Sequence, residues 1–158
     1  KNLYNEKRKS SKGRVTLRAV QLLVKTTIRN GKEIETIEQN VRAMLYEKGR
    51  FVYVQYEEVI SEQFPPIKTT LKVAENEMKI IRHGQVKMNQ TFMENEMTTG
   101  SYDAPFGQFH MTTNTTSYKQ EWQENKEAGR IQLTYALQLN EQKVGVYTLD
   151  FTIREDQS

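Results

Sequence analysis

The feature that most constrains this chain is a regular alternation of apolar and polar side chains along many short segments. In residues 131–139 apolar side chains occupy every second position, and residues 147–153 and 67–73 repeat the pattern. A period of two places one set of side chains against a core and the other in water, as in a half-buried β-strand. The sequence therefore predicts an all-β protein.

Composition and turn signals agree with this prediction. Val, Ile and Thr, whose branched side chains favour strands, number 36, against 16 for Ala and Leu. Glycine, proline and asparagine signals divide the chain into ten pieces, none of which leaves room for a helical crossover. Without crossovers, consecutive strands must pair antiparallel as a meander.

An apolar sheet face has to be covered, and no helices are expected to cover it. The strands must close into a barrel or fold into two stacked sheets. We predict an antiparallel meander β-barrel of about 8–10 strands, since a barrel of that size encloses either packed side chains or one small ligand. Its interior could be of either kind.

The charges separate a short tail from a single domain. Residues 1–14 hold six basic side chains and one acidic side chain, a net charge of +5, whereas the whole chain carries +3. The remainder is therefore −2. We interpret residues 1–14 as a basic N-terminal tail and residues 15–155 as one β-barrel domain. Such a tail can contact nucleic acid or an anionic membrane, or can simply be a solvated leader.

Glycine positions suggest the register of two hairpins. Three-residue loops commonly end in a residue with positive φ, which glycine adopts most easily. Applied to the loop ending at Gly84, this rule gives Gly84 a positive φ and places Ile80 opposite Val86. Applied to the loop ending at Gly49, it pairs the following residues: Leu45 with Phe51, and Ala43 with Tyr53. The rule works less cleanly at Gly31, because Asn30-Gly31 also suits a two-residue turn.

Groups suited to catalysis are few. The chain has no cysteine, which excludes disulfides and thiolate nucleophiles and is consistent with a reducing compartment. Of its two histidines, His83 falls in a predicted turn and His110 is predicted to point outward. The sequence has no metal-ligand spacing, no glycine-rich phosphate loop and no apolar run of the roughly 18 residues that a membrane helix needs. We therefore assign no catalytic residue, metal ligand or cofactor.

Polar side chains that should face inward are the candidates for a binding site. Gln90 lies between two apolar positions of one strand face, so its amide needs a partner, either a protein group or a ligand. Arg82 could pair with a carboxylate at the barrel mouth or bind an anionic head group. Tyr102 is a similar polar candidate. Tyr135 and Thr113 are predicted inside, where each is either core or a ligand contact.

One stretch resembles a known family. Residues 82–92, RHGQVKMNQTF, are similar to the YwiB-like family of small uncharacterised proteins from Firmicutes. Three further stretches agree at similar spacing: Tyr102 to Gly107, Thr112-Thr113, and Gly129-Arg130-Ile131 leading to Tyr135. The resemblance covers about residues 15–154 and implies a lipocalin-like, or calycin, β-barrel in a cytoplasmic bacterial protein. It implies no activity, because the family is a domain of unknown function.

Two kinds of function remain. The first is non-enzymatic binding of a small apolar or amphipathic molecule inside the barrel. The second is interaction with a protein or nucleic acid through the basic tail and the barrel exterior. The charge of −2 outside the tail counts against a broad phosphate-binding face, and the sequence shows no obvious exposed aromatic side chains for stacking bases. An enzyme is the least favoured class.

Overall fold

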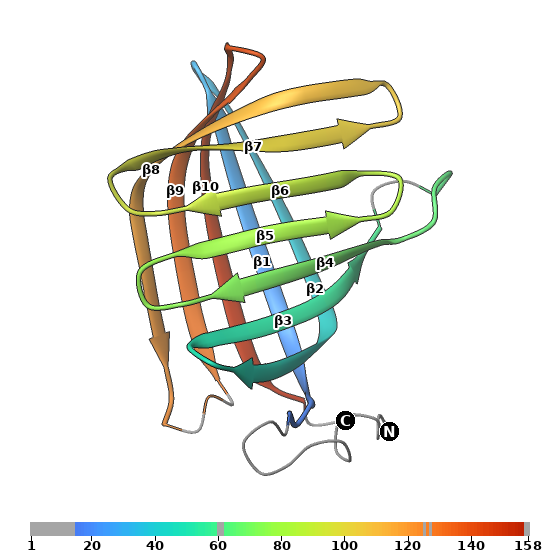
Figure 1. Ribbon diagram of the computed structural model, residues 1–158, viewed down its shortest axis with the longest axis vertical. Helices are drawn as coiled ribbons and strands as arrows, with labels where there is room; N and C mark the ends of the chain where they lie inside the picture. The colour runs from blue at the N-terminus through green and yellow to red at the C-terminus, as the bar shows by residue number, and fades with distance from the viewer. Residues whose placement is uncertain (1–14, 60–61, 125, 127, 157–158) are drawn as a thin grey trace.

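The computed structural model describes residues 15–59, 62–124, 126 and 128–156, and these form one closed barrel of ten antiparallel strands (Figure 1). Each strand pairs with the next in sequence, and β1 completes the ring against β10. The strands are β1 (Arg18–Asn30), β2 (Glu33–Lys48), β3 (Phe51–Glu58), β4 (Ile67–Val73), β5 (Met78–His83), β6 (Lys87–Phe92), β7 (Glu96–Ala104), β8 (Gly107–Trp122), β9 (Gly129–Leu139) and β10 (Gln142–Glu155). The predicted all-β meander barrel is confirmed. The basic tail at residues 1–14 lies outside the described residues.

The barrel consists of two layers whose strands cross at a steep angle. Figure 1 shows β3–β7 running across the front of the longer strands β1, β2, β8, β9 and β10. Two long strands join the layers: β2 pairs first with β1 and then with β3, and β8 pairs first with β7 and then with β9. A register shift between Thr115 and Ser117 in β8 marks an irregularity of the kind that bends a strand.

The alternating apolar positions form the core, as the pattern predicted. In β9 and β10 the buried side chains lie two residues apart. The same alternation runs through β4, where Thr70 is buried as well. The apolar side chains at 0% exposure come from seven of the strands: Leu22, Leu45, Val54, Leu71, Met78, Phe92 and Ile131. No helix among the described residues is long and apolar enough to cross a membrane.

The hairpin of β5 and β6 has a different register from the predicted one. Ile80 lies opposite Gln90, not Val86, and the connection between the strands is residues 84–86. Gly84 has a φ of 136°, so the predicted positive φ is confirmed, but this glycine begins the connection. Arg82 consequently lies in β5 and not in a loop.

The hairpin of β2 and β3 also departs from the prediction. Leu45 lies opposite Val54, because only Gly49 and Arg50 separate the two strands. Gly49 has a φ of 63° at the first position of this two-residue turn, the arrangement of a type II′ hairpin. The expected partners Phe51 and Tyr53 therefore point outward. The turn between β1 and β2 also has two residues, but they are Gly31 and Lys32 and not the predicted Asn30 and Gly31, since Asn30 lies opposite Glu33.

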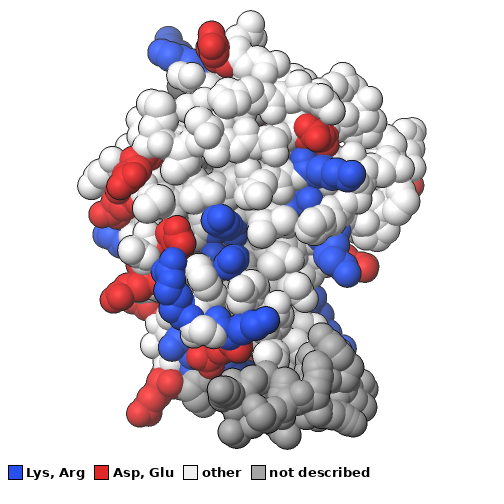
Figure 2. Space-filling view, viewed as in Figure 1, with Lys and Arg blue, Asp and Glu red and all other residues white. Residues whose placement is uncertain are grey.

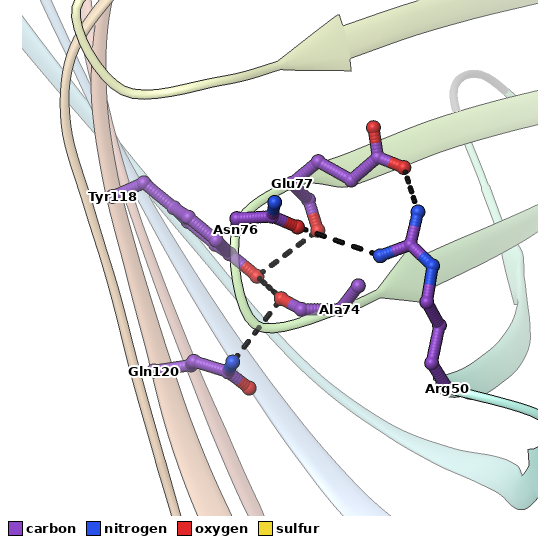
Figure 3. Close-up of polar contacts among 6 residues, drawn as sticks. All are labelled: Arg50, Ala74, Asn76, Glu77, Tyr118 and Gln120. Atoms are coloured by element: carbon purple, nitrogen blue, oxygen red, sulfur yellow. Dashed lines mark hydrogen bonds and ion pairs between the residues drawn. The ribbon is translucent and has the colours of Figure 1, made fainter.

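A set of polar contacts ties the turn between β4 and β5 to β8 (Figure 3). The hydroxyl of Tyr118 donates to the carbonyl of Ala74 at 2.6 Å, and the Gln120 amide donates to the same carbonyl at 3.1 Å. From the other side, Arg50 forms an ion pair with Glu77 at 2.9 Å. Burial, followed by the charge of Glu77, raises the pKa of Tyr118, so its hydroxyl remains a donor. These contacts lie at the turn between β4 and β5, whereas Arg82 lies near the other end of β5.

Replacing Tyr118 tests the strength of these contacts. We expect Tyr118→Phe to lower the free energy of unfolding by about 1 kcal/mol, because the Ala74 carbonyl loses its shortest hydrogen bond. Urea unfolding measures the change. Tyr53→Phe, which removes a hydroxyl from the outer face, is the matched control and should change little. Equal losses in both variants would contradict the role of the Tyr118 hydroxyl.

Candidate functional site

A partly enclosed cavity of about 260 Å³ lies inside the barrel at the end of β5 away from the Tyr118 contacts. Most of its wall is apolar. The side chains that line it come from both layers: Thr26, Ile80, Arg82, Met88, Gln90, Tyr102, Met111, Tyr135, Leu137, Leu139, Tyr147 and Leu149. Four of the five candidates from the sequence, Arg82, Gln90, Tyr102 and Tyr135, are thus brought to one place.

The fifth candidate supports this wall from behind. Thr113 does not line the cavity, but its side-chain oxygen accepts a hydrogen bond from the Gln90 amide at 2.9 Å. Both side chains are buried, at 4% exposure for Gln90 and 1% for Thr113. The predicted inward positions are confirmed, and the amide has the protein partner that burial demands.

Arg82 is held at the cavity by a carboxylate. Its Nε donates to Glu58 at 3.0 Å, and one terminal nitrogen lies 3.1 Å from the sulfur of Met88. The same oxygen of Glu58 accepts a hydrogen bond from the fully buried Thr69. This ion pair fixes the guanidinium and supplies both a cation and an anion close to an otherwise apolar wall. Pairing with a carboxylate, one of the two options for Arg82, is therefore observed.

Aromatic rings form one side of the cavity. Tyr135 stacks on Tyr147, with 5.2 Å between ring centroids and an interplanar angle of 11°, and Phe92 packs against Tyr135 at 4.9 Å. Tyr102 continues this side toward Phe109, with a centroid separation of 5.8 Å. The rings give the cavity flat apolar surfaces with hydroxyl groups at their edges.

The hydroxyls of Tyr135 and Tyr147 both have a raised pKa and stay protonated near neutral pH. Burial is the main cause that raises the pKa of Tyr135, with Tyr147 second, while Arg82 and the Gln90 amide act in the opposite direction. Burial also raises the pKa of Tyr147, followed by the charge of Glu35. Neutral phenols can both donate and accept, so this wall suits a polar group without requiring a particular charge.

Tyr147 and Glu58 are among the residues of this site that sequence reasoning did not single out. Tyr147 lies directly opposite Tyr135, but that pairing depends on an irregularity between Lys143 and Gly145 that the alternation pattern does not show. Glu58, at the end of β3, has no sequence signal that links it to Arg82, which lies two strands away.

A larger hollow of about 590 Å³ lies on the outside of the barrel. Its lining includes outward-facing side chains of β1 and β10, such as Gln21 and Arg154, together with residues of the segment that follows β8. We assign the candidate site to the smaller interior cavity, because a ligand there leaves water more completely and meets converging polar groups. Among the described residues no group of three or more His, Asp or Glu side chains is placed to hold a metal ion.

Comparisons with known proteins agree on the family. Residues 22–151 match the model of a domain of unknown function, DUF1934. The chain is 31% identical over 133 residues to the uncharacterised β-barrel protein YwiB of Bacillus subtilis, covering 84% of this chain and 91% of that protein. It is also similar to the crystal structure of the ywiB protein from Bacillus subtilis. The TM-score is 0.79 and the identity 28%, with 89% of this chain and 94% of that chain covered. The family match extends over most of the barrel, and the chain belongs to the DUF1934 family of YwiB-like β-barrel proteins.

Proposed function

We propose that this protein binds one small amphipathic molecule in the interior cavity and does not transform it. The observation that carries the proposal is the convergence of Arg82, Gln90, Tyr102 and Tyr135 on one cavity with a mostly apolar wall. Ligand sites typically combine an apolar lining with a few oriented polar groups. We therefore propose these four residues as ligand contacts and Thr113 as the residue that orients Gln90.

The volume limits the size of the ligand. The cavity has about 260 Å³, which corresponds to roughly nine water molecules at about 30 Å³ each. This is slightly below the usual range of roughly 300–1,000 Å³ for ligand sites. We therefore expect a short chain or a single small ring, with its polar group near the Arg82–Glu58 pair and its apolar part toward Leu137 and Leu149.

Two further points belong to this proposal. The barrel is lipocalin-like, which is supported by the meander order of the strands and by the two crossing layers. The protein acts in the cytoplasm, a location implied by the family resemblance and consistent with the absence of cysteine.

The proposal predicts that ligand binding depends on free space in the cavity. Native mass spectrometry of gently purified protein should show an added mass, and 1-octanol serves as a model ligand in calorimetric titrations. We expect Leu139→Trp to abolish both signals, because the indole would fill part of the cavity that Leu139 lines. Leu23→Trp, on the outer face of β1, is the matched control.

Thermal unfolding of each variant checks that the fold is retained. If the wild-type protein shows neither an added mass nor octanol binding, the interior cavity is not a ligand site. Loss of binding in both variants would equally reject the assignment to this cavity.

A further inference from the structure

We propose that the outer face of β3–β6 binds single-stranded nucleic acid, a role separate from ligand binding inside the barrel. The face carries a row of side chains that lie directly opposite one another on successive strands. In order across the sheet, the row consists of Thr91, Lys79, Lys72 and Tyr53 on β6 to β3, and it continues to Tyr46 on the adjoining β2. Two cations thus lie next to two aromatic rings. Figure 2 shows Lys and Arg side chains across the centre of this side of the molecule.

The pairing of Lys72 with Lys79 is the first argument for an anionic partner. Like charges directly opposite one another on antiparallel strands destabilise a sheet. The other lysines of this face have carboxylates opposite them in the register, Lys68 with Glu57 and Lys87 with Asp103. Lys72 and Lys79 face each other with no carboxylate opposite either of them in the register, so a phosphate between them would reduce their repulsion.

The aromatic rings beside this pair are the second argument. The ammonium group of Lys72 lies 4.4 Å from the ring centroid of Phe51 and 5.8 Å from that of Tyr53. Arg50 lies over the same Phe51 ring at 4.4 Å, and Tyr53 stacks on Tyr46 at 4.7 Å. Proteins that bind single strands combine cations for the phosphates with aromatic side chains for the bases.

This face fits a nucleic acid better than a membrane. Large apolar side chains that are well exposed would be needed to enter a lipid surface. Those of the described residues lie elsewhere on the barrel: Ile34, Ile37, Val59, Phe64, Met97, Phe106 and Val146. The outer face of β3–β6 presents cations and half-buried rings.

Fluorescence anisotropy with the full chain tests the proposal. The probe is a labelled uridine oligomer of about 15 nucleotides, a length that spans the usual site size of single-strand binders. We expect the double variant Lys72→Gln/Lys79→Gln to bind at least about tenfold more weakly, and the salt slope of log K to become smaller in magnitude by about 1.4. The control is Lys119→Gln/Lys143→Gln, which removes the same charge from exposed positions on β8 and β10.

Three results would overturn the proposal. One is a failure of the wild-type protein to bind the oligomer at about 50 mM salt, where electrostatic binding is strong. Another is an equal loss of binding in the two double variants, which would assign the effect to overall charge. The third is binding of inorganic polyphosphate as tight as that of the uridine oligomer, since that result would show that the bases contribute nothing to the affinity. Thermal unfolding of Lys72→Gln/Lys79→Gln checks that the fold is retained.

Discussion

Phe92→Ala should lower the free energy of unfolding by about 3–5 kcal/mol, the usual cost of truncating a buried phenylalanine. Phe92 has 0% exposure and lies at the end of β6, opposite Met78. Its ring packs on Tyr135 at 4.9 Å, between the core and the cavity wall. Removing it deletes apolar contacts and leaves a void that neighbouring strands, tied into a closed ring, can fill only in part. Urea unfolding at several temperatures measures the loss.

The chain supplies a matched control in Phe106. This phenylalanine is 74% exposed between β7 and β8, so Phe106→Ala should change the free energy of unfolding by less than about 0.5 kcal/mol. A similar loss in both variants, or a change below about 1 kcal/mol in Phe92→Ala, would show that Phe92 is not a core residue.

The alternation pattern predicted which side chains face inward more reliably than it predicted their partners. In the hairpin of β5 and β6 the observed partner of Ile80 is four residues further along than expected. A shift by an even number keeps every side chain on its own face, so Met78, Met88 and Gln90 are buried as predicted. The pattern fixes only the parity of the register, and the turn decides the rest.

The hairpin of β2 and β3 shows what happens when the register differs from the prediction by an odd number of residues. The two-residue turn at Gly49 and Arg50 shifts the expected pairing by an odd number, which reverses the two faces of β3. Val52, Val54 and Tyr56 are buried, whereas Phe51 and Tyr53 point outward. Tyr53 was predicted to lie opposite Ala43, which is buried in the structure, so the predicted register did not indicate that the Tyr53 ring faces outward.

The sequence predicted which side chains of the candidate site face inward, but it did not predict which of them come together in space. Alternation along single strands placed Gln90, Thr113 and Tyr135 inside, and closure of the ring brought them together. The contact between Arg82 and Glu58 joins strands β5 and β3, and it depends on how two separate hairpins align across β4. No local pattern encodes that alignment.

Gln90→Leu should lower the free energy of unfolding by about 1–3 kcal/mol, because it leaves the buried hydroxyl of Thr113 without its partner. The added volume of leucine compensates little, since the cost arises from the unpaired polar group. Thr113→Val should be destabilising for the complementary reason, because the Gln90 amide then loses its acceptor. Denaturant unfolding of the ligand-free protein measures both changes.

The double variant Gln90→Leu/Thr113→Val separates the structural role of this pair from its proposed role in binding. With both polar groups removed, the loss should be smaller than the sum of the two single losses, by a coupling energy of about 0.5–3 kcal/mol. The double variant should nevertheless bind octanol more weakly than the wild type does, because Gln90 lines the cavity and its amide is absent in the double variant. Strictly additive losses would show that the 2.9 Å contact contributes nothing to stability. Octanol binding as tight as that of the wild type would show that Gln90 serves only to join β6 to β8 through Thr113. Arg82 and the tyrosine hydroxyls would then be the groups that contact the polar end of the ligand.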